Sequence, residues 1–214
     1  MGGVSFHPEV LEAQQLRALE ATGSPLTARG FRLGGGTGLA LLLGHRQSED
    51  FDWFSTEPVG DPMLLAREIQ DEGVPLQVQQ VARGTIHGTV DGVRLSLLEF
   101  RYPLLAEPIR WPEHKIAILS LDDIASMKLS AIAQRGSRKD FVDLFALGQE
   151  HRPLAELLDL YRKKFDVHEI GHLLYSLVYF EDAEQERMPK MIWDIEWREV
   201  RERIESWVQE LASG

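Results

Sequence analysis

The chain has 214 residues, of which 43% are hydrophobic and 27% are charged, and this composition is typical of a globular protein with a sizeable core. It contains no cysteine, which excludes disulfides, thiolate metal sites and cysteine nucleophiles. No apolar run reaches ~18 residues and no basic region followed by an apolar run opens the chain, so we expect a cytoplasmic protein without a membrane span or secretory signal. The formal net charge of −11 argues against general nucleic-acid binding through phosphate neutralisation.

The first half of the chain predicts a small mixed sheet with flanking helices. An amphipathic helix is expected over residues 8–22, ending near Gly23, and a short apolar helix is expected over residues 37–43. Asp61 and Pro62 are suited to begin a further helix that ends near residue 71. Asp91-Gly92 predicts a two-residue hairpin turn. Strands are expected at residues 31–33, 50–54, 76–82, 85–90, 93–100 and 116–119.

From residue 120 onward nearly every segment has the pattern of a helix. We expect helices over residues 121–135, 138–150, 153–164, 168–180 and 193–211. The predicted fold class is therefore α+β, with a sheet-containing part over residues 1–119 and a helical subdomain over residues 120–214. The tryptophans of the last helix, at positions 193, 197 and 207, are expected to form core or a docking surface.

A glycine-rich turn followed by two aspartates is the most informative motif. Asp50 and Asp52 are two residues apart in a strand-like run, so both carboxylates are expected on one face while Phe51 and Trp53 point to the other. Glycines allow close backbone approach, and a helix beginning near Thr37 offers free N–H groups to phosphate oxygens. Paired carboxylates suit one or two Mg²⁺ ions that bridge a triphosphate, while a plain tight turn with solvated aspartates is the alternative.

A second group of charged residues lies on two expected helices. Lys128 and Arg135 are seven residues apart and share one helix face, while Asp140 and Asp143 are three apart and share another. Basic residues beside acidic ones suit the neutralisation and positioning of a triphosphate. The alternative is an ordinary helix pair joined by exposed salt bridges.

A third pattern, His168-Glu169-Ile170-Gly171-His172, matches the H-E-x-x-H signature of zinc proteases. The extended form of that signature is absent because Tyr175 stands where it requires glycine. A five-residue pattern also occurs by chance, so zinc catalysis is kept as a minor alternative.

The first two motifs together resemble the nucleotidyltransferases of the AbiEii/AbiGii type IV toxin family, within the DNA polymerase beta-like superfamily. Residues 35–54, GGTGLALLLGHRQSEDFDWF, and residues 128–147, KLSAIAQRGSRKDFVDLFAL, carry the resemblance, and residues 179–197 also have the family's character. The resemblance implies a minimal nucleotidyltransferase core followed by a helical half. It also implies a toxin-like enzyme that transfers a nucleotide from an NTP to a tRNA end or protein and has a partner antitoxin.

The resemblance assigns roles to individual residues. It implies that Asp50 and Asp52 bind Mg²⁺ or Mn²⁺ and that Lys128 and Asp140 are also catalytic. The residues that it implies for nucleotide binding are Gly35, Gly36, Thr37, Arg135 and Asp143. Arg46 and Ser48 are expected to bind the nucleotide as well, because Ser48 has the same phase as the aspartates and Arg46 is near enough to touch phosphate.

One position departs from the superfamily pattern. Members often carry a third carboxylate on a later strand, where it helps to activate the attacking hydroxyl, and Ser96 stands at that place here. Glu99 faces the opposite side by alternation unless a bulge shifts the register, and Asp140 is the other candidate replacement. The expected function is therefore a metal-dependent nucleotidyltransferase, with a catalytically weak nucleotide- or partner-binding module as the alternative.

Overall fold

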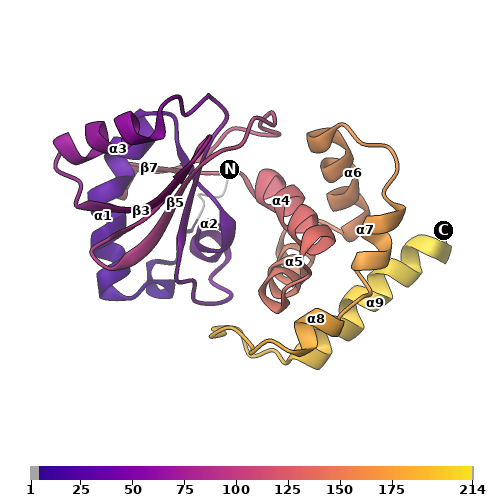
Figure 1. Cartoon of the computed structure of the whole chain (residues 1–214). Coiled ribbons are helices and arrows are strands. Elements are labelled where there is room, and N and C mark those ends of the chain that lie inside the picture. The colour runs from indigo at the N-terminus through magenta and orange to yellow at the C-terminus, as the bar shows by residue number, and fades with distance from the viewer. Residues whose placement is uncertain (1–4, 214) are drawn as a thin grey trace. The chain divides into compact units, whose positions relative to one another are not determined.

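The computed structural model describes residues 5–213 and separates into two compact units, Met1–Ser120 and Leu121–Gly214. The first unit holds the sheet and the second is helical (Figure 1). The predicted α+β class is confirmed, because a mixed sheet is followed by a run of helices.

Over the described part of the chain, the sheet unit is built on seven strands in the order β3-β4-β5-β2-β1-β7-β6. The pairs β2–β5 and β1–β7 are parallel and the remaining pairs are antiparallel. The strands are β1 (Arg32–Leu33), β2 (Phe51–Ser55), β3 (Leu76–Ala82), β4 (Thr85–Val90), β5 (Val93–Glu99), β6 (Ile109–Trp111) and β7 (Ile116–Ile118). β6 was not expected from the sequence.

The central strands alternate between a buried face and an open face. On β2, Phe51 and Trp53 are fully buried whereas Asp52 is half-buried. The same alternation runs along β5, where Leu95 and Leu97 are buried and Ser96 is half-buried. The predicted hairpin turn between β4 and β5 is confirmed, since Val90 pairs with Val93 and both turn residues have positive φ. The sheet therefore has a second face on which polar side chains remain accessible.

Within the described residues of this unit there are three α-helices, namely α1 (Ala13–Ala28), α2 (Gly35–Leu43) and α3 (Pro62–Asp71), and two 3-10 helices, Pro8–Val10 and Pro112–His114. Figure 1 shows α1 and α3 on the same side of the strands. The predicted end of the first helix near Gly23 is wrong, because α1 begins at Ala13 and continues through Gly23 and Pro25. Gly23 is required for packing instead of termination, since a Cβ there would lie 2.5 Å from Cγ1 of Ile116.

The helical unit contains α4 (Leu121–Gln134), α5 (Arg138–Glu150), α6 (Leu154–Phe165), α7 (Gly171–Ser176), α8 (Glu181–Glu184) and α9 (Trp197–Ser213). α4 packs on α5 and α6, and α5 also packs on α9. Gly148 of α5 admits the Trp207 ring of α9, because a Cβ at Gly148 would lie 2.2 Å from that ring. Trp207 is thus part of the core, as one of the two expectations had it.

Two expected helices of this unit differ from the structure. The helix expected over residues 168–180 is only the short α7, and a separate short α8 follows it. The last helix begins at Trp197, so Trp193 precedes it. Among the described residues, no helix is both long and apolar enough to cross a membrane.

Candidate active site

The glycine turn packs directly against the aspartate strand. The backbone N–H of Gly34 donates to the carbonyl of Asp52 at 2.8 Å. Gly35 follows with a φ of +59°, and a Cβ on it would lie 2.6 Å from Oδ2 of Asp52. Glycine is therefore required at position 35 both for the backbone conformation and for the space that the Asp52 carboxylate occupies. The N-terminus of α2 and the Asp52 carboxylate lie next to each other.

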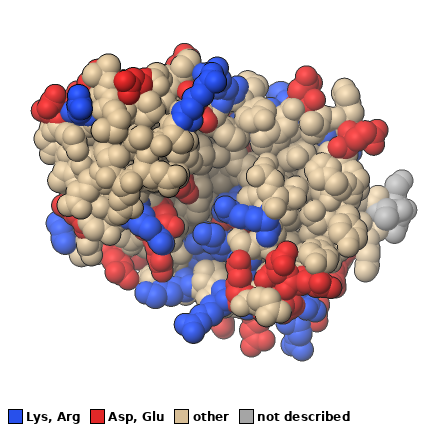
Figure 2. All heavy atoms as spheres, viewed as in Figure 1, with Lys and Arg blue, Asp and Glu red and all other residues tan. Residues whose placement is uncertain are grey.

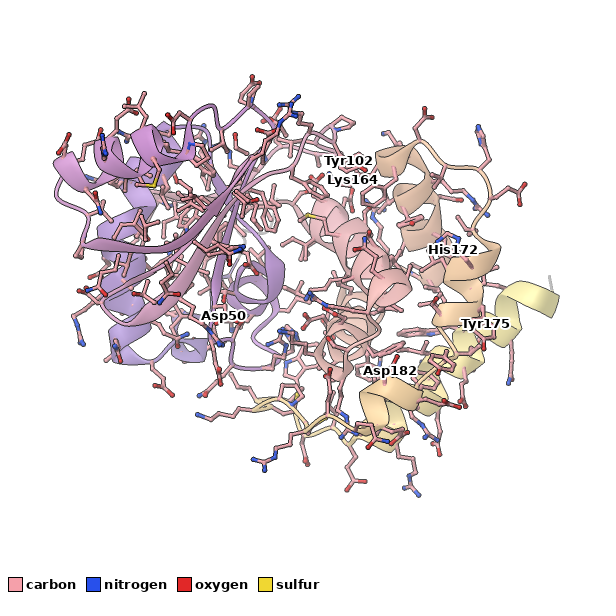
Figure 3. The ribbon with its side chains drawn as sticks, in the orientation of Figure 1. Asp50, Tyr102, Lys164, His172, Tyr175 and Asp182 are labelled. Carbon is pink, nitrogen blue, oxygen red and sulfur yellow. The ribbon has the colours of Figure 1, made fainter. Side chains whose placement is uncertain are left out.

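Asp50 lies one residue before β2 and is held from two sides. Its carbonyl accepts a hydrogen bond from the Thr37 hydroxyl at 2.5 Å, and Thr37 is fully buried. Its carboxylate Oδ1 accepts from Nε of Arg94 at 2.6 Å. Asp50 is labelled in Figure 3. The Arg94 side chain is 66% exposed and that of Asp50 is 37% exposed, so this ion pair is open to solvent. The carboxylate raises the pKa of Arg94 through that hydrogen bond.

Asp52, Ser96 and His87 form a row across three neighbouring strands. Asp52 of β2 pairs in register with Ser96 of β5, and Ser96 pairs with His87 of β4. Nδ1 of His87 and Oγ of Ser96 are 3.1 Å apart, which is hydrogen-bonding distance. All three residues are half-buried. The strand neighbour of Asp52 on the open face is therefore a hydroxyl supported by an imidazole.

Glu99 does not take the place of a third carboxylate. The β2–β5 pairing runs from Phe51↔Leu95 to Ser55↔Glu99 without a shift, so the bulge considered from the sequence is absent from this strand pair. Glu99 Oε2 accepts from the backbone N–H of Val59 at 2.9 Å, and Oε1 contacts Nε of Arg101 at 2.5 Å. The hydrogen bond from the Val59 backbone, followed by the one from Arg101, lowers the pKa of Glu99. The alternative in which a bulge brings Glu99 into the site is wrong.

Arg46 and Ser48 line the glycine turn from the segment that precedes β2. A Cβ on Gly36 would lie 2.5 Å from Nη2 of Arg46 and 3.0 Å from Oγ of Ser48. Arg46 is 4% exposed and Nη1 donates to the Gln47 carbonyl at 2.8 Å. Nε2 of Gln15 donates to the Ser48 carbonyl at 2.5 Å, which fixes the segment to α1. A guanidinium, a hydroxyl and the N-terminus of α2 thus meet at the two glycines.

The oxygen-rich donor set suits a hard divalent cation. Mg²⁺ prefers carboxylate and water oxygens, and the Asp52 carboxylate lies beside the glycine turn with the Ser96 strand position next to it. Asp50 already holds a cation, the guanidinium of Arg94. Because exposed ion pairs contribute only about 0–1 kcal/mol, a metal ion can displace Arg94 at small cost. Asp50 and Asp52 therefore fit a metal ion, although the described residues hold no group of three or more metal-binding side chains.

The second predicted set forms a closed ion-pair network inside the helical unit. Nζ of Lys128 contacts Asp140 at 3.0 Å and Asp143 at 2.5 Å, and both aspartates are fully buried. Nε and Nη2 of Arg135 donate to Asp140 at 2.8 and 3.1 Å, and the Ser137 hydroxyl donates to it at 2.7 Å. The network joins α4 to α5. Arg135 alone of these five is substantially exposed, at 58% of its side chain.

Asp140 accepts hydrogen bonds from three side chains of this network. Burial by itself would raise its pKa, but the charge of Lys128 and the hydrogen bonds from Arg135 and Ser137 outweigh burial and lower the pKa. Both oxygens accept hydrogen bonds from these groups. As a result, any ligand of Asp140 has to displace an existing partner.

The H-E-x-x-H pattern does not form a zinc site. Its first histidine, His168, lies before α7, which begins only at Gly171, so the two histidines are not on one helix. His172 lies on α7 (Figure 3). No group of three or more His, Asp or Glu side chains able to hold a metal occurs in residues 5–213. The zinc-protease alternative is wrong.

Charged side chains of both signs are interspersed over the face seen in Figure 2. The net charge of −11 is therefore not spread as a uniformly acidic surface there.

The match to a family model defines the class of protein, which is a nucleotidyltransferase, an enzyme that transfers a nucleotide to an acceptor. The chain belongs to the family described as "Nucleotidyl transferase AbiEii toxin, Type IV TA system", whose pattern matches residues 83–210. That match begins after the aspartate pair. A protein of Aquifex aeolicus (strain VF5), aq_aa25, is 40% identical over 204 residues, which cover 94% of this chain and 97% of the relative.

Two solved structures share the fold. MenT4, a nucleotidyltransferase toxin from Mycobacterium tuberculosis H37Rv, has a TM-score of 0.59 and 13% identity, covering 92% of this chain and 82% of its own. A structure described as a putative nucleotidyltransferase from H. pylori has a TM-score of 0.54 and 18% identity, covering 94% of this chain and 95% of its own. The resemblance to the AbiEii family that the sequence indicates is thus confirmed.

Sequence reasoning missed Arg94, His87 and Gln15. The Asp91-Gly92 turn is a signal that could have indicated Arg94 and His87. A two-residue hairpin that pairs Val90 with Val93 also pairs His87 with Ser96. Gln15 gives no signal in the sequence, since its bond to the Ser48 carbonyl depends on where α1 packs.

Proposed function

We propose that this enzyme transfers a nucleotide from an NTP to an acceptor hydroxyl and that Asp50 and Asp52 hold the divalent metal ion, Mg²⁺ or Mn²⁺. The observation that carries the proposal is the contact between the glycine turn and the Asp52 carboxylate, which puts an anion-binding helix start beside a cation-binding group. The acceptor oxygen forms a bond to the α-phosphorus, the bond to pyrophosphate breaks, and pyrophosphate leaves with the electron pair.

The residues of the turn have separate tasks in this proposal. The backbone N–H groups at Gly35 and Gly36 donate to phosphate oxygens, and Arg46 and Ser48 bind phosphate beside them. Thr37 holds the backbone of Asp50 through its hydroxyl. When bound, the metal ion neutralises phosphate charge and orients the reacting groups.

The family resemblance also assigns a role to four residues of the helical unit. It implies that these residues act on the nucleotide, namely Lys128, Arg135, Asp140 and Asp143. The ion-pair network favours Arg135 as the phosphate contact, because its guanidinium is held by Asp140 and is still exposed. We expect Lys128, Asp140 and Asp143 to act mainly by fixing Arg135 and the α4–α5 pair.

The acceptor that we propose is an RNA such as a tRNA end, with a protein hydroxyl as the other outcome of the test. Membership of a type IV toxin family favours a toxin that is restrained by a partner antitoxin. An enzyme that consumes NTPs is expected to act in the cytoplasm.

The test is transfer of label from each α-³²P NTP, with Mg²⁺ or Mn²⁺, to total tRNA and to protein. Asp52→Ala should reduce transfer by a factor on the order of a thousand, because several kcal/mol of charge stabilisation are lost with the metal. Asp71→Ala, an exposed aspartate at the end of α3, serves as the matched control and should label as the wild type does. Equal labelling by the wild type and Asp52→Ala would overturn the proposal.

A second candidate is a nucleotide- or partner-binding module with weak catalysis. Two observations favour it, namely the serine at position 96 and the guanidinium of Arg94 on Asp50. Calorimetry that shows binding of an NTP with Mg²⁺, together with no transfer to any acceptor, would select this candidate over the enzyme.

A further inference from the structure

The open face of the sheet has a hydroxyl beside the Asp52 strand position, not a carboxylate. Ser96 pairs with Asp52 in the parallel β2–β5 ladder, so the two residues lie on the same face about 4.8 Å apart along the hydrogen-bonding direction. Nucleotidyl transfer requires a group that takes the proton of the attacking hydroxyl. Glu99 is on the other face, so this proton needs another acceptor.

A ring nitrogen of His87 lies close enough to Ser96 to accept the proton of its hydroxyl. Nδ1 of His87 is 3.1 Å from Oγ of Ser96. In the tautomer that carries its hydrogen on Nε2, Nδ1 is unprotonated and accepts the hydroxyl hydrogen. The Ser96 oxygen then has lone pairs left for a second hydroxyl. Activation of a hydroxyl by a hydrogen-bonded imidazole is an established form of general base chemistry.

The two strands that flank His87 carry few charged side chains. β3, which pairs with β4 at Gln80↔His87, has no ionisable side chain over Leu76–Ala82. From β5, Arg94 lies on the same face as Ser96, two residues earlier. One strand further, Asp52 and the Arg94-bound Asp50 are the acidic groups.

We propose that the Ser96–His87 pair accepts the proton of the acceptor hydroxyl and so replaces the missing third carboxylate. This proposal rests on the nucleotidyltransferase function proposed above. The acceptor proton moves to Oγ of Ser96 while the Ser96 proton moves to Nδ1 of His87. The acceptor oxygen bonds to the α-phosphorus, the α-phosphorus–oxygen bond to pyrophosphate breaks, and His87 later releases the proton to water. Ser96 contacts the reacting hydroxyl, and His87 is a positioning residue that acts through Ser96.

The test compares single-turnover label transfer by the wild type, Ser96→Ala and His87→Gln across pH 5 to 9. Both variants should transfer at least about 100-fold more slowly than the wild type. The shape of the wild-type pH–rate profile should change in His87→Gln, because the imidazole is the group that takes the proton. His172→Gln, an exposed histidine on α7, should retain the wild-type rate and pH profile.

A rescue variant separates proton transfer from simple structural support. Ser96→Asp restores a carboxylate at the strand neighbour of Asp52. The His87→Gln substitution should then cost less than threefold in the Ser96→Asp background, because the carboxylate no longer needs the imidazole. A histidine that only ties β4 to β5 would cost the same in both backgrounds.

Mn²⁺ affinity gives a readout that does not depend on turnover. Ser96→Asp should bind Mn²⁺ about tenfold or more tightly than the wild type, since a third carboxylate joins Asp50 and Asp52. Unchanged affinity would overturn the inference, because Ser96 would then lie away from the metal. Loss of transfer in Asp52→Ala with full transfer in Ser96→Ala and His87→Gln would also overturn it and leave the proposed function intact. No transfer by the wild type would end both.

Discussion

The two charged motifs of this chain have opposite environments. In the sheet unit, Asp50 and Asp52 lie at an open face, and the cation on Asp50 comes from an arginine that is 66% exposed. In the helical unit, Asp140 and Asp143 are fully buried and share the ammonium group of Lys128, which is itself almost wholly enclosed. The first motif can exchange its partner for another cation, whereas the second cannot do so without disrupting the packing of α4 on α5.

This difference indicates that the sheet motif serves ligand binding and that the helical network serves stability. An exposed ion pair contributes little to stability and is easily replaced by a ligand. A buried pair costs several kcal/mol when one partner is removed, since the other charge is left uncompensated. We therefore expect substitutions in the sheet motif to change metal binding and transfer while the fold is kept, and substitutions in the helical network to change stability first.

Replacing Lys128 tests the structural half of this comparison with the largest expected effect. Lys128→Met should lower the free energy of unfolding by about 3–5 kcal/mol, because Asp140 and Asp143 lose their shared cation. Urea unfolding followed by circular dichroism measures the loss. Lys163→Met, at an exposed lysine of α6, should change stability by less than about 0.5 kcal/mol. A loss below about 1 kcal/mol in Lys128→Met would show that the network does not stabilise the unit.

A pair of glycine substitutions tests whether the glycine turn of the sheet motif is needed for nucleotide transfer. Gly35 and Gly60 have φ values of +59° and +69°, so alanine at either position carries a similar backbone strain of about 1–2 kcal/mol. Only at Gly35 does the new Cβ meet Asp52, at 2.6 Å from Oδ2, while Gly60 has open space around it. Gly35→Ala should reduce transfer about 100-fold through displacement of the carboxylate, and Gly60→Ala should leave the rate unchanged. Equal rates in the two variants would contradict the role of the turn.

The acid stability of the network gives a third, smaller effect. The folded pKa of Asp140 is lowered relative to the unfolded value of about 3.9, so the stabilisation is present above that pH and is lost as the pH falls through the folded pKa. The difference in unfolding free energy between the wild type and Asp140→Asn should stay constant from pH 7 to about 5 and narrow below about 4. Urea unfolding at each pH measures it. A constant difference in unfolding free energy down to pH 3 would mean that the stabilisation by Asp140 does not depend on its negative charge.

Arg94 gives the smallest expected change. Arg94→Gln removes the guanidinium from Asp50 and should tighten Mn²⁺ binding by less than about tenfold, because an exposed pair is worth at most about 1 kcal/mol. Arg67→Gln, an exposed arginine of α3, should leave the Mn²⁺ affinity unchanged. Weaker Mn²⁺ binding in Arg94→Gln would show that the arginine supports the metal site instead of competing for it.

Much of the fold and of the site can be predicted from local rules. Alternation along β2 correctly separates Asp52 from Phe51 and Trp53, and the Asp91-Gly92 turn sets the β4–β5 register. The resemblance places Ser96 where superfamily members often carry a third carboxylate, and in the structure Ser96 pairs with Asp52. These features depend on neighbours in the sequence or on one hairpin.

Features that depend on tertiary packing could not be predicted. Gly23 has the local chemistry of a helix end, but its missing side chain serves contact with Ile116, and α1 continues. The burial of Lys128, Asp140 and Asp143 was also unexpected, because the same spacing suits exposed salt bridges.

Titration with Mn²⁺, followed by electron paramagnetic resonance, is the most direct measurement. The wild type should bind the ion, Asp52→Asn should lose binding, and Asp71→Asn should retain it. Equal Mn²⁺ affinity in the wild type and Asp52→Asn would contradict the assignment of the open carboxylates as the metal site.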